Sequence, residues 1–306
     1  MEIKIELGHG KGAGSQQFLR LLSGRYGNLL YPRSGFFVEL IDRASQLWRY
    51  KARIMRTTSD KSADGIPKVD KAGQVVWIDG KKAQVMHNGL HVRYGGYHQH
   101  WMAHIIKKLK GHHEPEEEAM FHKVLQTLPD DAVMLEVGSY WAYYSLWFRW
   151  GHDGRKNYLI EPNPEKIQIG RDNFALNGLE GDFSQYFMSK SLDTEGFLDW
   201  DGTVKADVKP MTVDEFIRQK NIKHLDVLHA DIQGAEEDLL LGAEQAMSSK
   251  EISHLFISTH QDKHEKCKAL LRGYGYRIVF DHDIDASSSA DGLIVAEVDP
   301  GSREQR

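Results

Sequence analysis

Residues 133–145, VMLEVGSYWAYYS, decide the fold class, because an apolar run ends there in an acid and a glycine before helical spacing begins. The pattern predicts a strand over residues 132–137, a turn at Gly138 and a helix over residues 145–150. Glycine has no Cβ, so the backbone can turn sharply there and a ligand can approach it closely. In an open α/β sheet such a turn lies at the carboxyl end of a strand, where ligands bind.

An acid accompanies each of the first two predicted strands. Glu136 lies near the end of the first, and Glu161 comes directly after a second strand over residues 157–160. In nucleotide-binding α/β folds, an acid after the second strand hydrogen-bonds the ribose hydroxyls. Tyr140 and Ala142 stand where dinucleotide-binding turns often have glycine, which argues against NAD and FAD. The alternative is a buried strand with an ordinary turn glycine, but the paired acids favour a cofactor.

A third acid follows the strand predicted over residues 224–229. Asp231 and Gln233 come between this strand and Gly234, which opens the next helix. Because the carboxyl ends of parallel strands meet at one edge of a sheet, we expect Asp231 to lie beside Glu136. Asp231 could hold a cofactor's amino group, orient a substrate hydroxyl or bind a metal ion. The alternative is that Asp231 or Gln233 only caps the following helix.

The rest of the C-terminal part alternates strands with helices. Further strands are predicted over residues 183–188, 253–258, 277–281 and 292–298, and helices over residues 114–128, 164–176, 213–219, 234–247 and 264–274. This alternation predicts an α/β fold with a mostly parallel, seven-stranded sheet that helices cover on both faces. The last two strands follow each other without a helix between them, so one strand is expected to be antiparallel.

The N-terminal part has a different character and is predicted to be an α+β extension. Helical spacing occurs over residues 16–22, 36–54 and 101–109, a polar linker over residues 57–75, and a hairpin over residues 75–78 and 83–86 around Asp79-Gly80. We expect residues 1–110 to serve substrate recognition or oligomerisation, including a homo-oligomer, and residues 111–306 to be the catalytic domain. Residues 75–96 could cover the cleft as a lid.

The composition is that of an ordinary globular protein and excludes several classes. A net charge of -5 argues against a nucleic-acid partner, because a phosphate-binding surface is normally basic. The one cysteine, Cys267, allows no intrachain disulfide and no cysteine-rich zinc site. No apolar run approaches the ~18–20 residues of a membrane helix, and the N-terminus lacks the apolar centre of a signal peptide. We therefore expect a cytoplasmic protein without a membrane span.

These segments together resemble the FkbM family of methyltransferases. The resembling stretches are HHEPEEEAMF (112–121), LEVGSYWAYYSLWF (135–148), YLIEPNPEKIQIGRDNFALNG (158–178), LDVLHADIQGAEEDLLLGA (225–243), FISTH (256–260) and SADGLIVAE (289–297). The resemblance implies a Rossmann-like class I methyltransferase fold with S-adenosyl-L-methionine as the methyl donor. It also implies O-methylation of a small-molecule or glycan acceptor, typically a hydroxyl of a sugar or a natural product.

The resemblance also assigns cofactor-binding roles to residues of this chain. The residues are Glu136, Gly138 and Ser139 along the methionine part, Glu161 at the ribose, Asp231 and Gln233 beside the sulfonium, and Glu117 at the amino end. For Glu117 the alternative is a solvated acidic face of its helix. Tyr140, in the turn, is a candidate to stack on the adenine or on a sugar, as is Trp141.

His260, at the end of the strand over residues 253–258, is the candidate general base or substrate-orienting residue beside Asp231, because histidine titrates near neutral pH. The alternative is a polar strand end without a catalytic role. A metal site is the minority interpretation, and the residues for it are His229, Asp231, His260, Asp262 and His264. The competing functions are a nicotinamide-dependent oxidoreductase and a non-catalytic binding domain.

Overall fold

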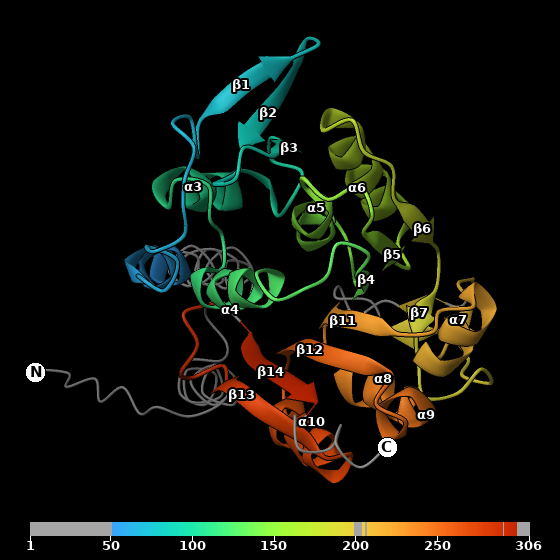
Figure 1. Ribbon diagram of the computed structural model, residues 1–306. Helices are drawn as coiled ribbons and strands as arrows, with labels where there is room; N and C mark the ends of the chain where they lie inside the picture. The colour runs from blue at the N-terminus through green and yellow to red at the C-terminus, as the bar shows by residue number, and fades with distance from the viewer. Residues whose placement is uncertain (1–50, 199–203, 206, 290, 299–306) are drawn as a thin grey trace, which may run out of the picture. The chain divides into compact units, whose positions relative to one another are not determined.

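The computed structural model describes residues 51–198, 204–205, 207–289 and 291–298 (Figure 1), and Arg53–Arg306 form one compact unit. The helix predicted over residues 16–22 and most of that over residues 36–54 lie outside the described residues. In the part of the chain that is described, no helix is long and apolar enough to cross a membrane.

A seven-stranded sheet forms the centre of this unit, in the order β13-β14-β12-β11-β4-β5-β6. Its strands are β4 (Val133–Val137), β5 (Lys156–Ile160), β6 (Asp182–Ser184), β11 (Leu225–Asp231), β12 (Ile252–Thr259), β13 (Tyr276–His282) and β14 (Gly292–Val298). Within it β14 runs antiparallel to both of its neighbours, and the other described pairs are parallel. The predicted mostly parallel sheet with one antiparallel strand is confirmed.

Helices cover both faces of the sheet. The face that packs against the first core cluster carries α3 (Gln99–Lys108), α4 (Pro115–Leu125), α5 (Tyr143–Arg149) and α6 (Pro164–Leu176), and the opposite face carries α7 (Val213–Lys220), α8 (Glu236–Leu241), α9 (Glu244–Ser248) and α10 (Lys263–Gly273). Along β12, Phe256 joins the first cluster while its neighbours Leu255 and Ile257 join the second. This alternation is the two-residue period of a strand, and it explains why both faces need a helical cover.

Two predicted elements are wrong in their extent. The strand predicted over residues 183–188 is divided, because β6 joins the main sheet while β7 (Phe187–Met188) pairs in parallel with β10 (Pro210–Met211). The helix predicted over residues 234–247 is divided into α8 and α9. The carboxylate of Asp214 accepts hydrogen bonds from the backbone N–H groups of Gln245 and Ala246, and thereby caps a new helix in place of a continued one.

The hairpin near residue 80 is confirmed and extends into a third strand. β1 (Val75–Ile78), β2 (Lys81–Val85) and β3 (His91–Arg93) pair antiparallel, and the short strands β8 (Phe197–Leu198) and β9 (Val204–Lys205) pair elsewhere. Asp79 and Gly80 both have a positive φ, as the tight turn between two twisted strands requires. The side chains of Asn173 on α6 and of Asn177 at its C-cap hydrogen-bond the backbone of β3, which fixes this small sheet to the helical layer.

Candidate active site

A cavity of about 430 Å³ lies at the carboxyl ends of β4, β5 and β11. Its lining includes eight of the predicted site residues, namely Glu117, Glu136, Gly138, Ser139, Tyr140, Glu161, Asp231 and Gln233. The ninth, His260, lies at its rim, where its Nε2 is 3.6 Å from Asp231 Oδ1. The structure therefore brings all nine to one edge of the sheet, as the strand ends predict.

Gly138 makes the closest approach in this site. Its φ is +73°, and a Cβ added to it would lie 1.9 Å from the backbone oxygen of Asp231. Any other residue would therefore push the turn after β4 away from the end of β11. Ser139 follows with a buried hydroxyl that has no hydrogen-bond partner within the described residues. A ligand in the cavity can supply the partner that this hydroxyl lacks.

Glu161 is fixed in place by the backbone around it. Its Oε2 accepts a hydrogen bond from the N–H of Tyr140 (3.2 Å), and its Oε1 accepts one from the N–H of Asn163 (2.9 Å). Asn163 in turn caps α6, because its side chain accepts hydrogen bonds from Glu165 and Lys166. A carboxylate oxygen can accept more than one hydrogen bond, so the buried Glu161 has the chemistry to bind a pair of hydroxyls.

Glu117 is buried, so the alternative of a solvated helix face is wrong. Its Oε1 lies 2.7 Å from His229 Nε2, across the cavity wall between α4 and β11. Burial opposes a charge on His229, but the facing carboxylate of Glu117 outweighs it and raises the pKa of this histidine. Glu136 accepts a hydrogen bond from the N–H of Ser145 in the first turn of α5 (3.0 Å), and burial raises its pKa.

His260 sits among three carboxylates, and we call Asp231, Glu236, His260 and Asp291 the cavity cluster. Its Nδ1 is 2.8 Å from Glu236 Oε1 and its Nε2 is 3.1 Å from Asp291 Oδ1. Burial opposes a charge on the ring, but the hydrogen bonds to Asp291 and Glu236 outweigh it and raise the pKa of His260 to about 11. At neutral pH His260 is an imidazolium, so it has no free lone pair with which to remove a proton.

The pKa of Asp231, unlike that of His260, lies near neutral pH. Burial in the cavity wall, with the carboxylates of Asp291 and Glu114 nearby, raises its pKa to about 7, although the charge of His260 opposes the shift. The side-chain amide of Gln233 donates a hydrogen bond to Asp231 Oδ1 (3.0 Å) and holds it at the rim. A carboxylate that titrates near pH 7 is well suited to take a proton from a substrate at physiological pH.

Two members of the cavity cluster escaped the sequence analysis. Glu236 lies in the first turn of α8, where acids are common, and only the fold shows that it is completely buried against His260. Asp291 precedes β14, which is antiparallel to its neighbours. The amino end of an antiparallel strand lies at the same edge as the carboxyl ends of the parallel ones, so this acid could have been found from the topology.

An aromatic wall closes one side of the cavity. The ring of Tyr97 stacks on Trp141 with centroids 4.5 Å apart and an interplanar angle of 4°, and it meets Tyr140 edge-on at 5.2 Å. His98 lines the cavity beside them, with a positive φ of 44° that is uncommon outside glycine. Tyr97 and His98 follow residues 75–96, and no described residue of that proposed lid lines the cavity itself.

The minority metal cluster does not assemble at this edge. His264 lies with its Nδ1 2.7 Å from Thr259 Oγ1 and its Nε2 2.7 Å from Asp281 Oδ1. Asp262 is exposed and pairs with Lys266 at 2.8 Å. Both side chains therefore have partners away from Asp231 and His260.

The cavity has a strongly acidic lining. Its carboxylates are those of Glu114, Glu117, Glu136, Glu161, Glu165 and Asp231. Lys166 is the one lysine or arginine among the described residues that line it. Such a lining favours a cationic ligand and repels a diphosphate, so it disfavours a dinucleotide.

Residues 129–278 match the family described as Methyltransferase FkbM domain. This part of the chain belongs to the FkbM methyltransferases. The FkbM domain contains every strand of the sheet from β4 to the start of β13 and, with them, Glu136, Glu161 and Asp231. The strand order and the single antiparallel strand are those of the Rossmann-like class I methyltransferase fold. No curated protein matches the chain.

The solved structures similar to this chain include methyltransferases of low sequence identity. TrmK of M. capricolum, in complex with S-adenosyl-homocysteine, is 15% identical, with 58% of this chain and 67% of that chain covered and a TM-score of 0.39. Precorrin-6y C5,15-methyltransferase of Geobacter metallireducens is 14% identical, with 60% and 88% covered and a TM-score of 0.38. TM-scores this low are not evidence for a shared fold. The fold of the FkbM domain therefore follows from its own strand order.

Proposed function

We propose that the protein is an S-adenosyl-L-methionine-dependent O-methyltransferase that acts on a hydroxyl of a sugar, a glycan or a natural product. The observation that carries the proposal is the convergence of Glu136, Glu161 and Asp231 on one acidic cavity within an FkbM domain. The cofactor bears a sulfonium and an ammonium against a single carboxylate, so its net charge is complementary to this lining. When bound, it supplies an electrophilic methyl group.

The residues present fit this cofactor. Glu161, whose carboxylate is held by backbone hydrogen bonds at the end of β5, would accept from the ribose hydroxyls. Gly138 leaves space for close approach, and the unpartnered hydroxyl of Ser139 can bond the methionine part. The carboxylate of Glu117 would face the amino group. A nicotinamide dinucleotide would instead place its diphosphate against these acids.

The cavity cluster would handle the proton of the acceptor. Methyl transfer to a hydroxyl needs an in-line approach of the oxygen, and positioning supplies much of the rate. Asp231, with a pKa near 7, would accept the hydroxyl proton as the transfer proceeds. His260, as an imidazolium, would keep Asp231 ionised and orient it, which differs from the base or substrate-orienting role predicted for this residue.

The acceptor would lie against the aromatic wall. The stacked pair of Tyr97 and Trp141 gives a flat apolar surface that suits the face of a sugar ring or an aromatic natural product. Tyr97 and His98 lie within residues 1–110, which supports substrate recognition as one task of that extension. We further propose that the N-terminal extension ends at residue 110. The same extension would also form the contact of a homo-oligomer.

Calorimetric titration tests the cofactor first. We expect S-adenosylhomocysteine to bind the purified protein with one site per chain and NADH to give no heat. A panel of hydroxylated sugars and natural products is then offered with S-adenosylmethionine, and release of S-adenosylhomocysteine is measured. Binding of NADH alone would overturn the proposal in favour of an oxidoreductase. Cofactor binding without methylation of any acceptor would favour a non-catalytic domain.

A further inference from the structure

Three buried side chains from separate segments meet outside the cofactor cavity. His87 follows β2, His112 precedes α4, and Glu118 lies in the first turn of α4; their exposed fractions are 2%, 1% and 0%. One donor atom from each lies within 4.8 Å of the others. None of the three is among the described residues that line the cavity at the strand ends. We propose that this buried histidine cluster binds a divalent transition-metal ion, Zn²⁺ by preference.

The hydrogen bonds of His87 leave it in the form that a metal requires. Its Nδ1 lies 3.2 Å from the carbonyl oxygen of Pro67, to which it can only donate. The lone pair is therefore on Nε2, which is buried and has no partner among the described residues. An imidazole whose other nitrogen donates to a backbone carbonyl is the usual arrangement of a metal-bound histidine.

His112 and Glu118 lie in direct contact. Nδ1 of His112 hydrogen-bonds Glu118 Oε2. An ion that takes the place of the proton between these two atoms has both of them as ligands, and the proton is released to water. The rings of His87 and His112 stack with centroids 4.3 Å apart and an interplanar angle of 15°, and rotation of the His87 ring brings its Nε2 toward the same position. The ion then supplies the partner that the buried His87 Nε2 lacks in a metal-free protein.

Glu118 supplies the negative charge that such a site needs. Its Oε1 accepts a hydrogen bond from the N–H of His113 (2.8 Å), which fixes the carboxylate while Oε2 faces His112. Two imidazoles and one carboxylate suit zinc, whereas magnesium and calcium prefer oxygen ligands throughout. Ligands of a tetrahedral zinc ion lie roughly 3.4 Å apart. Binding therefore needs the donor atoms to move to this spacing, which is within the reach of side-chain rotation.

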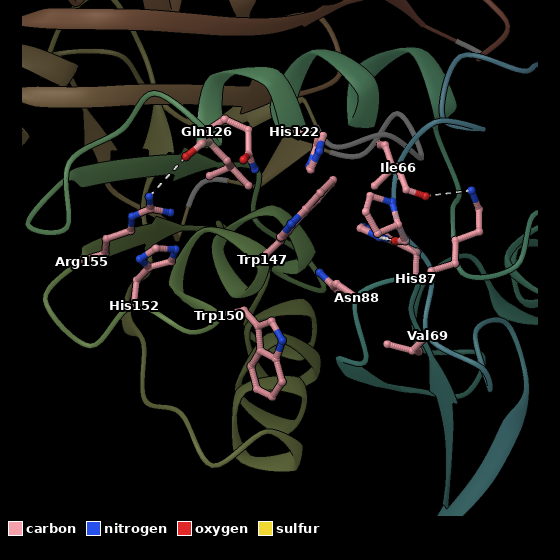
Figure 2. A pocket seen from close by; sticks show the side chains of 13 residues that line it. Ile66, Val69, His87, Asn88, His122, Gln126, Trp147, Trp150, His152 and Arg155 are labelled. Carbon is pink, nitrogen blue, oxygen red and sulfur yellow. Dashed lines mark hydrogen bonds between the residues drawn. The ribbon is translucent and has the colours of Figure 1, made fainter.

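A path for the ion exists. His87 also lines a hollow of about 370 Å³ together with Asn88, His122 and Trp147 (Figure 2). Trp147 meets the ring of His87 edge-on at 4.4 Å. A zinc site with three protein ligands keeps a fourth position for water, and the hollow gives water and the ion access to His87. The bound ion would join the small sheet of β1–β3 to α4, which carries Glu117 of the cofactor cavity.

The test starts with the metal content of the wild-type protein. We expect about one zinc per chain by mass spectrometry after purification, its loss on dialysis against a chelator, and its recovery when zinc sulfate is added. Addition of zinc in about hundredfold excess over its Kd should raise Tm by roughly 5 °C. Less than a tenth of an equivalent of zinc, with no shift in Tm, would overturn the proposal. The readouts do not depend on methyl transfer.

Variants then locate the ion. Glu118→Gln and His87→Asn keep the size and much of the hydrogen bonding but remove a ligand, so zinc affinity should fall at least tenfold. His104→Ala, an exposed histidine on α3, is the matched control and should bind zinc as the wild type does. His87→Cys should still bind, and with Co²⁺ it should gain a thiolate charge-transfer band. Zinc binding that none of the cluster variants changes would place the ion elsewhere and overturn the assignment.

Discussion

The cavity cluster and the buried histidine cluster combine the same residue types with opposite results. In the first, hydrogen bonds to Asp291 and Glu236 outweigh burial and raise the pKa of His260 to about 11. In the second, burial outweighs the one carboxylate nearby and lowers the pKa of His87 to about 4. A carboxylate that hydrogen-bonds the imidazole directly, as in His260 but not in His87, thus decides whether the ring is a cation or an uncharged ligand. The first state suits the positioning of an acid, and the second suits metal binding.

The largest expected effect comes from removing the proposed base. Asp231→Asn should lower kcat for O-methylation by roughly 10²–10⁴, the usual contribution of general base catalysis. Binding of S-adenosylhomocysteine should change by less than about threefold, because the amide keeps the shape. Steady-state kinetics and calorimetry measure the two quantities. The exposed Asp262→Asn is the control, and an unchanged kcat in Asp231→Asn would show that another group removes the proton.

A smaller effect is expected at His260. His260→Gln removes the cation that holds down the pKa of Asp231, so that pKa should rise above about 7. The kcat at neutral pH should fall roughly tenfold because less of Asp231 is ionised, and the loss should be recovered at higher pH. The pH–rate profile of the variant measures this. His224→Gln, at the opposite edge of the sheet, is the control; a loss that is equal at every pH would assign His260 a structural role alone.

The smallest expected effect is the change of the wild-type kcat/KM with pH. Asp231 accepts a proton only when ionised, so kcat/KM should rise with pH through an apparent pKa near 7 and then level off. His260, with a pKa of about 11, should not contribute a second step between pH 6 and 9. A profile that falls as pH increases across this range would require a protonated group in the reaction and would contradict the assignment.

Local patterns in the sequence were enough to predict the order of the elements and the edge of the sheet at which the site lies. The acids after β4, β5 and β11 could be placed together because parallel strands end at one edge. The breaks in residues 183–188 and 234–247 could not be predicted, since they depend on distant partners such as the carboxylate of Asp214.

The charge states of the histidines depend on the fold even more than the boundaries of the helices and strands do. His260 was a reasonable base by residue type, but its pKa is set by Glu236 and by Asp291, which the antiparallel β14 brings to the same edge. His87 and His112 attracted no metal assignment because their spacing in the sequence resembles no ligand motif. Only the packing of β2 against the start of α4 brings their rings together.

The central claim is that the acidic strand ends bind one sulfonium nucleoside, and one calorimetric experiment tests it most directly. S-Adenosylhomocysteine is titrated into wild-type protein, Glu161→Ala and Glu165→Ala. Both glutamates line the cavity, but Glu161 is buried and fixed by two backbone hydrogen bonds whereas Glu165 is exposed. We predict a Kd at least tenfold higher for Glu161→Ala and one within about twofold of wild type for Glu165→Ala. Equal affinity in all three proteins would contradict the account.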